Sequence, residues 1–201
     1  VPSLIWHFFN DTAPSEGPLG RRDHAASYDE DEQTLILHGG VTTAGFSEGH
    51  AIFDHETWLF DVSSNTWIEG TQGLGSTAGP GARIGHAMIY DPSTQLTLLH
   101  GGMCPTPAPE GEATTYTLCP AEDLWQWGEE AHQWTSIPIQ SDPDAPSPSP
   151  RSEHFMASAP SLGGVLMMYG DGEEDIWLWE REGNTWTEIP QAGSTPGART
   201  G

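Results

Sequence analysis

Arginine and histidine recur together along this chain of 201 residues, and histidine is a natural candidate for acid–base catalysis. The motif is Arg-x-x-His, and its copies are Arg21 with His24, Arg83 with His86, and Arg151 with His154. A single active site requires one such group, whereas this motif returns once in every repeat at the same position. The repetition favours a structural role in which these side chains hold strands or loops together, so we expect no catalytic residue among them.

A second group of polar side chains clusters in the segment EGHAIFDHE. Its possible metal ligands are Glu48, His50, Asp54, His55 and Glu56. Imidazole and carboxylate groups suit zinc or copper, but their spacing here matches no known metal-ligand pattern. An acidic loop that contains histidine can equally be solvated surface. We therefore expect no metal or other cofactor, and the acidic stretch 29–32 is interpreted as an exposed turn because it lacks the spacing of a calcium loop.

Cys104 and Cys119 are the only cysteines, and they stand at the feet of the longest predicted loop. The feet of a hairpin lie close together, so the pair can satisfy the geometry of a disulfide. Closing such a loop stabilises a fold by about 3 kcal/mol in the chain-entropy model. The alternative is a pair of free thiols, or a metal site, in a reducing compartment. We predict the bridge and hence an exported protein, extracellular or at the cell surface, in which Asn10 of the sequon Asn-Asp-Thr is a candidate for glycosylation.

The charge of the chain is strongly negative. Asp and Glu total 29 against six arginines, lysine is absent, and the formal net charge is −23. Such a chain repels phosphate backbones and anionic lipid surfaces, so we expect no nucleic-acid partner. No run of about 18 apolar residues is present, so no membrane insertion is expected. The acidity either serves solubility or attracts cations or a basic partner.

The elements that must position these side chains are also repeated. Tryptophans lie nine residues apart at Trp58 and Trp67, at Trp125 and Trp134, and at Trp177 and Trp186. Nine residues span one hairpin with its turn, so each pair is predicted to lie on the third and fourth strands of a four-stranded meander. An acidic residue stands two positions before the first tryptophan of each pair; these residues are Glu56, Asp123 and Asp175.

Glycine pairs mark the end of the second predicted strand. The triplets His38-Gly39-Gly40 and His100-Gly101-Gly102 follow the first two motif histidines by fourteen residues. We align the third copy as Tyr169-Gly170-Asp171, one residue later. These glycines are expected to serve tight backbone geometry, since no helix start or lysine follows them as in a phosphate loop.

Double glycines, the acidic residue before the third strand and the two spaced aromatics together resemble the kelch repeat, in which each unit is one blade of a β-propeller. The resemblance implies an all-β fold of kelch type, here an arc of three four-stranded antiparallel blades plus strand stubs at each end. Residues 1–201 then form one partial propeller. Its parts are 1–20, the last strand and exit loop of a preceding blade; blades at 21–82, 83–150 and 151–198; and 199–201, the start of a further blade. The remaining blades would come from the rest of the chain or from another copy.

Some kelch relatives are enzymes, namely copper radical oxidases, a sialic acid epimerase and iron-dependent specifier proteins. The oxidases need a tyrosine joined to a cysteine, with further tyrosine and histidine ligands. Here Tyr28 and Tyr90 are equivalent in register, and our alignment places Tyr169 with the histidines of the triplets. The oxidase pattern is therefore absent from this portion. We expect a non-enzymatic extracellular interaction or structural module; the alternatives are the propeller portion of a secreted enzyme whose catalytic residues lie partly outside this segment, and an intracellular adaptor.

The loops between the second and third strands differ most in length. They run over about 41–55 and 103–122 in the first two blades and shrink to a few residues in the third. Loops that grow on a fixed scaffold often carry function. Their expected contact residues for a protein or other cationic partner are Phe46, Glu48, His50, Phe53, Asp54, Glu110, Glu112 and Tyr116.

Overall fold

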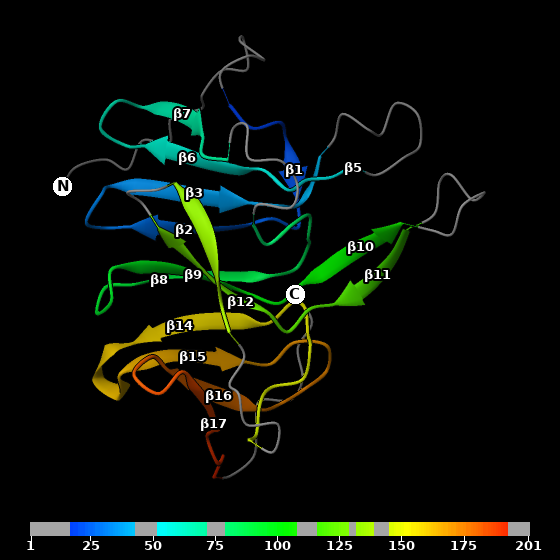
Figure 1. Ribbon diagram of the computed structural model, residues 1–201, viewed down its shortest axis with the longest axis vertical. Coiled ribbons are helices and arrows are strands. Elements are labelled where there is room, and N and C mark those ends of the chain that lie inside the picture. Colours follow the sequence, from blue (N-terminus) through cyan, green and yellow to red (C-terminus); the bar gives the residue numbers. More distant parts are fainter. Residues whose placement is uncertain are drawn as a thin grey trace, which may run out of the picture.

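The computed structural model describes residues 17–42, 52–71, 79–107, 116–128, 132–138 and 145–192. Within these ranges the chain forms three four-stranded antiparallel sheets, each a simple meander, that stack side by side (Figure 1). Blade 1 contains β2 (Ala25–Asp29), β3 (Thr34–His38), β6 (Thr57–Asp61) and β7 (Thr66–Glu69). Blade 2 contains β8 (Ala87–Asp91), β9 (Leu96–His100), β12 (Leu124–Gly128) and β13 (Gln133–Ile137). Blade 3 contains β14 (Phe155–Ala159), β15 (Gly164–Met168), β16 (Ile176–Glu180) and β17 (Thr185–Glu188).

Smaller strands extend the long loops between second and third strands. Blade 1 adds the sheet β1-β4-β5, formed by β1 (Arg21–Arg22), β4 (Val41–Thr42) and β5 (Ile52–Phe53). Blade 2 adds the hairpin of β10 (Met103–Pro107) and β11 (Tyr116–Pro120), which projects from the stack in Figure 1. In blade 3 the 3-10 turn η2 (Pro160–Leu162) joins β14 to β15.

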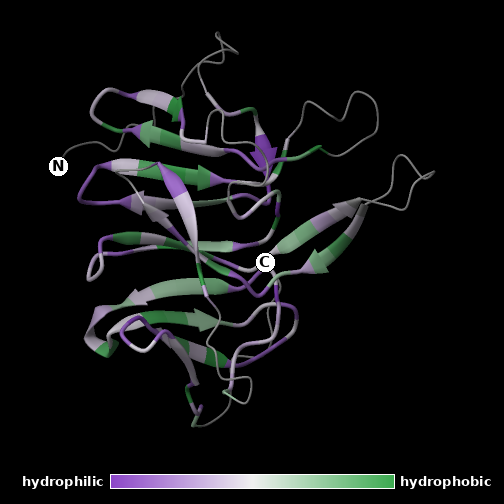
Figure 2. Cartoon of the chain, viewed as in Figure 1, coloured by the Kyte–Doolittle hydropathy of each residue, from purple (hydrophilic) through white to green (hydrophobic). Residues whose placement is uncertain are grey.

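The hairpin turns have the local chemistry that the strands require. In blade 1, Asp61 ends β6 and its carboxylate accepts the backbone N–H groups of Ser63 and Ser64 at 2.7 and 3.1 Å. Asn65 then adopts a positive φ of 61° before β7 begins. Asp and Asn favour such turns because their side chains bond to the backbone and tolerate the left-handed conformation. Polar residues accordingly gather at the ends of the strands and apolar residues along them (Figure 2).

The apolar core lies between the blades. One cluster joins blades 1 and 2 and contains Ile36, Leu59, Met88, Leu99, Trp127 and Trp134. Another joins blades 2 and 3 and contains Leu98, Leu124, Val165 and Trp179. Trp127 and Trp179 are 1% and 2% exposed. Burying about 150–250 Å² per tryptophan at about 25 cal/mol/Å² contributes about 4–6 kcal/mol each as an upper bound, so packing between blades is a large stabilising contribution.

The predicted all-β fold of adjacent four-stranded meanders is confirmed. The tryptophan pairs lie on the third and fourth strands of each blade, as expected. The stubs predicted at 1–20 and 199–201 lie largely or wholly outside the described residues, as does Asn10, and they stay predictions. Among the helical segments of the described ranges, none has the length and apolarity needed to cross a lipid bilayer.

Candidate functional site

The arginine of each Arg-x-x-His motif anchors its own blade. Arg83 is 1% exposed and donates to the carbonyl of Gly101 at 2.7 Å. Its guanidinium also forms two hydrogen bonds with the Asp123 carboxylate, at 2.8 and 2.9 Å. The same carboxylate accepts the indole N–H of Trp125 at 2.6 Å. The acidic residue before the third strand therefore links the motif arginine to the first tryptophan of the pair.

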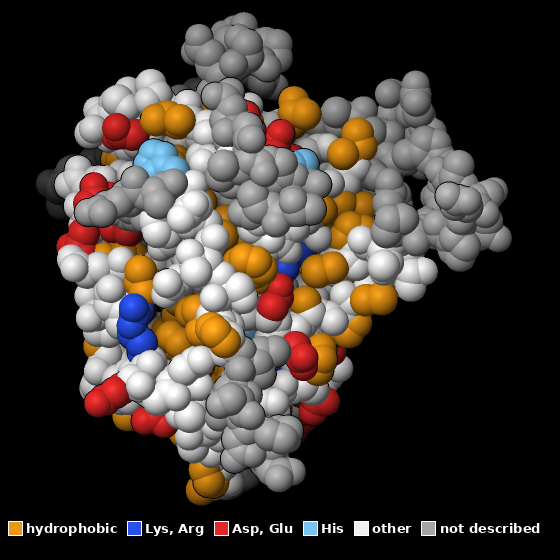
Figure 3. All heavy atoms as spheres, in the orientation of Figure 1, with side chains coloured by type: hydrophobic (Ala, Val, Ile, Leu, Met, Phe, Trp, Pro, Cys, Tyr) orange, Lys and Arg blue, Asp and Glu red, His pale blue; other side chains and the backbone are white. Residues whose placement is uncertain are grey.

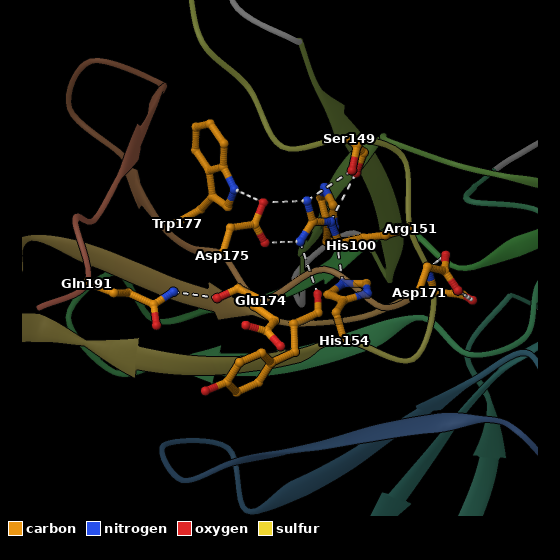
Figure 4. A network of polar contacts seen from close by, with 11 residues as sticks. His100, Ser149, Arg151, His154, Asp171, Glu174, Asp175, Trp177 and Gln191 are labelled. Atoms are coloured by element: carbon orange, nitrogen blue, oxygen red, sulfur yellow. Dashed lines mark hydrogen bonds and ion pairs between the residues drawn. The ribbon is translucent and has the colours of Figure 1, made fainter. Parts of the chain in front are cut away.

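Blades 1 and 3 repeat this arrangement. Figure 4 shows Arg151 donating to the carboxylate of Asp175, which also accepts the Trp177 indole N–H at 2.7 Å. In blade 1, a guanidinium nitrogen of Arg21 lies 3.1 Å from a carboxylate oxygen of Asp54 and 3.7 Å from one of Glu56. The carboxylate of Glu56 accepts the indole N–H of Trp58 at 2.8 Å, which completes the third copy. The arginines thus have the structural role that their repetition indicated.

Burial of the carboxylates and bonding to arginine act in opposite directions on their pKa values. Burial raises the pKa of Asp123, but the hydrogen bonds from Arg83 and Trp125 outweigh it and hold the pKa below its ordinary value. The same balance, between burial and bonds from Arg151 and Trp177, lowers the pKa of Asp175. Both groups are therefore ionised at neutral pH and pair with buried guanidinium groups.

The motif segments of successive blades are joined directly through their backbones. Gly85 donates its N–H to the carbonyl of Asp23 at 3.1 Å, and Glu153 donates to the carbonyl of Gly85 at 2.7 Å. All three residues have positive φ, at 58°, 63° and 55°. This chain of hydrogen bonds sets the starts of β2, β8 and β14 side by side along the inner edge of the arc.

The motif histidines pack against the glycine triplet of the preceding blade. His100 and His154 form a hydrogen bond at 3.1 Å between Nδ1 and Nε2, and the His38 and His86 rings meet edge to face at 5.6 Å. Burial lowers the pKa of His38 to about 3 and that of His154 to about 4, and it lowers the pKa of His86 well below 6.5. These imidazoles are therefore neutral at pH 7 and serve the blade junctions.

A cavity of about 540 Å³ opens where the three motif segments meet. We call it the axial cavity. It is lined by Arg22, Asp23, His24, Ile84, Gly85, His86, Met103, Ser152, Glu153, His154 and Phe155. Corresponding residues from all three blades contribute, so the cavity lies on the inner edge of the arc at the entry of the first strands.

The long loops begin at the rim of this cavity. Val41 of β4 pairs with Arg22, and Met103 of β10 exchanges backbone hydrogen bonds with Ile84 at 2.8 and 3.0 Å. Because Arg22, Ile84 and Met103 line the cavity, the extra strands of blades 1 and 2 grow outward from its edge. The axial cavity and these loops form one surface, which we call the loop face.

The expected contact residues have different environments. Phe53 is half-buried on β5. Tyr116 begins β11, and its backbone pairs with that of Pro107 at the end of β10. Asp54 is 8% exposed and is engaged by Arg21, so its carboxylate serves the scaffold and is not available to a partner. The others lie outside the described residues; they are Phe46, Glu48, His50, Glu110 and Glu112.

Cys104 and Cys119 are directly opposite each other in the β10–β11 ladder. Directly opposed residues of antiparallel strands have Cα atoms about 4.5–5.5 Å apart, which is within the range that a disulfide spans. The structure records the two as separate thiols, so the disulfide stays a prediction. Among the described residues, no group of three or more His, Cys, Asp or Glu side chains is arranged to hold a metal ion.

One alignment made from the sequence is wrong. Phe155 pairs with Met168 just as Ala25 pairs with His38 and Ala87 with His100. Met168 is therefore the equivalent of the triplet histidines, and Tyr169 takes the place of the first glycine. Blade 3 keeps only the second glycine of the triplet, Gly170, so the glycine pair that marks the register in blades 1 and 2 does not mark it there.

Sequence reasoning also missed the lining of the axial cavity. The signal was present between and just after the motif residues, at Asp23, Gly85 and Glu153 and at Ala25, Ala87 and Phe155. These positions vary in chemistry while the flanking arginine and histidine do not.

Comparison with known proteins agrees with this geometry. The family model described as the KLHDC2/KLHL20/DRC7 Kelch-repeats domain matches residues 5–201. The chain belongs to the kelch-repeat family. This kelch domain is also similar to the tRNA wybutosine-synthesizing protein 4 of Emericella nidulans, with 28% identity over 178 residues. The matched region covers 83% of this chain but only 14% of that relative.

Proposed function

We propose that this kelch domain is a protein-recognition module whose loop face binds a segment of a partner protein. The axial cavity carries this proposal, because it is lined by all three blades and bordered by the loops that vary most in length. Pockets lined by several elements and rimmed by variable loops are the usual place for recognition on a rigid scaffold. Membership of the kelch family supports a role in protein interaction.

The charge of the domain favours a basic partner. The net charge is −23, and acidic side chains are spread over the surface in Figure 3 while basic ones are sparse. The motif arginines form ion pairs with neighbouring carboxylates and are themselves buried, so they do not offset the acidic side chains of the outer surface. A partner with clustered Lys or Arg would be attracted to it, and binding would weaken as salt rises, with a Debye length of about 8 Å at physiological ionic strength.

The proposal includes export to an oxidising compartment. It is supported by the directly opposed positions of Cys104 and Cys119 in the ladder, since opposed Cα atoms lie within the range that a disulfide spans. A module at the cell surface or outside the cell would then present its loop face to an extracellular partner.

A second candidate is a module within a longer enzyme. The similarity to a tRNA wybutosine-synthesizing protein, of which this chain spans a small part, supports it. The strongly negative charge disfavours contact between this portion and RNA. In that setting the loop face would bind another protein or another domain, and catalysis would reside outside this segment.

Partner capture by matched surface variants tests the proposal. Met103→Arg places a guanidinium at the rim of the axial cavity, where it should repel a basic partner, and Leu162→Arg places one on η2, at the opposite end of β14. A partner isolated with the wild-type domain should be lost with Met103→Arg and retained with Leu162→Arg, provided that both variants melt cooperatively. Equal retention by the two variants would place recognition elsewhere.

A further inference from the structure

We propose that the axial cavity holds a positively charged side chain of the partner, an arginine or lysine, between the ring of Phe155 and the carboxylate of Glu153. This inference rests on the proposed function and names the chemistry of its central contact. It is carried by three features of the cavity: an aromatic ring that blade 3 supplies where blades 1 and 2 have alanine, a carboxylate that no described residue engages, and the charge balance of the remaining lining.

The aromatic ring is specific to blade 3. Phe155, Ala25 and Ala87 begin the innermost strands and occupy one register, each opposite the last residue of the second strand. Blades 1 and 2 therefore show that a methyl group is sufficient for the scaffold here. Phe155 is nevertheless 55% exposed and lines the cavity. An exposed aromatic face within a cavity is suited to a cation, which it attracts through the ring quadrupole.

The carboxylate of Glu153 is two residues away. In the described part of the chain, no hydrogen bond or ion pair engages this carboxylate, and the side chain is exposed. Its backbone has a positive φ of 55°, a conformation that blade 2 satisfies with Gly85. A glutamate is thus placed where the backbone favours glycine, and the carboxylate is left available at the cavity.

The rest of the lining leaves the cavity with a net negative charge. Arg22 and Asp23 form an ion pair at 2.6 Å and cancel one another. Burial is the main cause that lowers the pKa values of His24, His86 and His154 below 6.5, so these imidazoles are neutral at pH 7. Glu153 then remains as the uncompensated charge among these residues.

This balance selects among ligand types. An anionic group would be repelled by Glu153 and would find its nearest guanidinium already paired with Asp23. An apolar group that covered Glu153 would leave a desolvated carboxylate without a partner, which is costly. A guanidinium or ammonium group satisfies both Glu153 and the face of Phe155, and its aliphatic stem can pack on Met103 and Ile84.

Titration with short peptides tests this inference. The probe is acetyl-Gly-Gly-Arg-Gly-Gly-amide, and its reference is the same peptide with citrulline, which has nearly the same shape without the charge. We expect the arginine peptide to cause saturable NMR shifts at the backbone amides of Gly85, Glu153 and Phe155, and the citrulline peptide to bind at least about five-fold more weakly.

Two variants assign the contact. Glu153→Gln and Phe155→Ala, the latter restoring the residue of blades 1 and 2, should each weaken arginine-peptide binding at least about five-fold. Glu182→Gln and Leu162→Ala, at exposed positions away from the cavity, should not change it. Equal binding of the two peptides, or undiminished binding by Glu153→Gln, would overturn the cation site. If partner capture were still abolished by Met103→Arg in that case, the loop face would stand and only its proposed ligand chemistry would be wrong.

Discussion

Gly39 of blade 1 lies against the backbone carbonyl of Arg83 in blade 2, so closely that a Cβ on Gly39 would be 2.7 Å from that oxygen. The next residue, Gly40, donates its N–H to the same carbonyl at 2.9 Å. Gly101 stands in the same relation to Arg151 of blade 3. One contact between a glycine and an arginine carbonyl therefore sets the distance between successive blades.

Replacing Gly101 by alanine should destabilise the domain strongly. The residue has a φ of 65°, and its new Cβ would meet a backbone oxygen that cannot move without separating the blades. Backbone strain and overpacking together should cost about 2–5 kcal/mol. Urea unfolding measures the change. The matched control is Gly81→Ala, since Gly81 has a φ of 75° but nothing within 4 Å of its Cβ position, and about 1 kcal/mol is expected there. Equal losses for the two variants would contradict the clash.

Removing the carboxylate that pairs with Arg83 should also be costly. Asp123→Ala leaves a guanidinium that is 1% exposed without its charged partner. Breaking such a pair should lower the free energy of unfolding by about 3 kcal/mol. Glu122→Ala removes the neighbouring carboxylate, for which no ion pair occurs among the described residues, and should change stability by less than about 0.5 kcal/mol. Thermal unfolding of both variants distinguishes a structural pair from a general effect of charge.

The buried histidines predict a loss of stability in mild acid. His38 and His154 have folded-state pKa values of about 3 and about 4, against about 6.5 in the unfolded chain. Between pH 6.5 and 4 the unfolded chain therefore binds more protons than the folded domain. The free energy of unfolding should fall as the pH drops through this window and should be independent of these groups above about pH 7.

Urea unfolding at pH 7 and pH 5 measures this effect. In His154→Gln the difference between the two pH values should be smaller than in the wild type, because one of the buried neutral imidazoles is removed. A wild-type domain that is equally stable at both pH values would contradict the neutral, buried state of these rings.

The cysteine pair provides a prediction about the environment of the domain. Protein isolated without reductant should contain a bond between Cys104 and Cys119 and should resist alkylation until it is reduced. Its loss in Cys119→Ser should lower stability by about 3 kcal/mol. Intact mass before and after reduction and alkylation measures the bond directly. Two thiols that alkylate freely without reductant would remove both the bridge and the support for export.

The blade architecture could be predicted from the sequence because the same residues recur at the same positions in each of three repeats. The spacing of Trp125 and Trp134 reports one hairpin, and its recurrence reports the blade. Repetition also indicated that Arg83 and its counterparts are structural residues, and the ion pairs that they form have this role. The role of Asp123 was not predicted, because its partner Arg83 is forty residues away and only the fold brings the two together.

The candidate site was harder to predict for a physical reason. The axial cavity exists only where segments from three blades converge, and nothing in a local pattern indicates that Phe155 and Met103 share it. The same limit applies to Asp54. The sequence indicates a loop carboxylate that could contact a partner, whereas the fold buries it against Arg21. Register caused the remaining error, because Tyr169 holds a backbone conformation that the other blades assign to glycine.

Hydrogen exchange of the domain with and without its partner tests the recognition claim most directly. Binding at the loop face should slow exchange in the motif segments that line the axial cavity, 22–24, 84–86 and 152–155, and at the start of β10. The turns that join first to second strands, at the opposite end of the blades, should be unchanged. Protection confined to those turns, with the motif segments unaffected, would contradict the account.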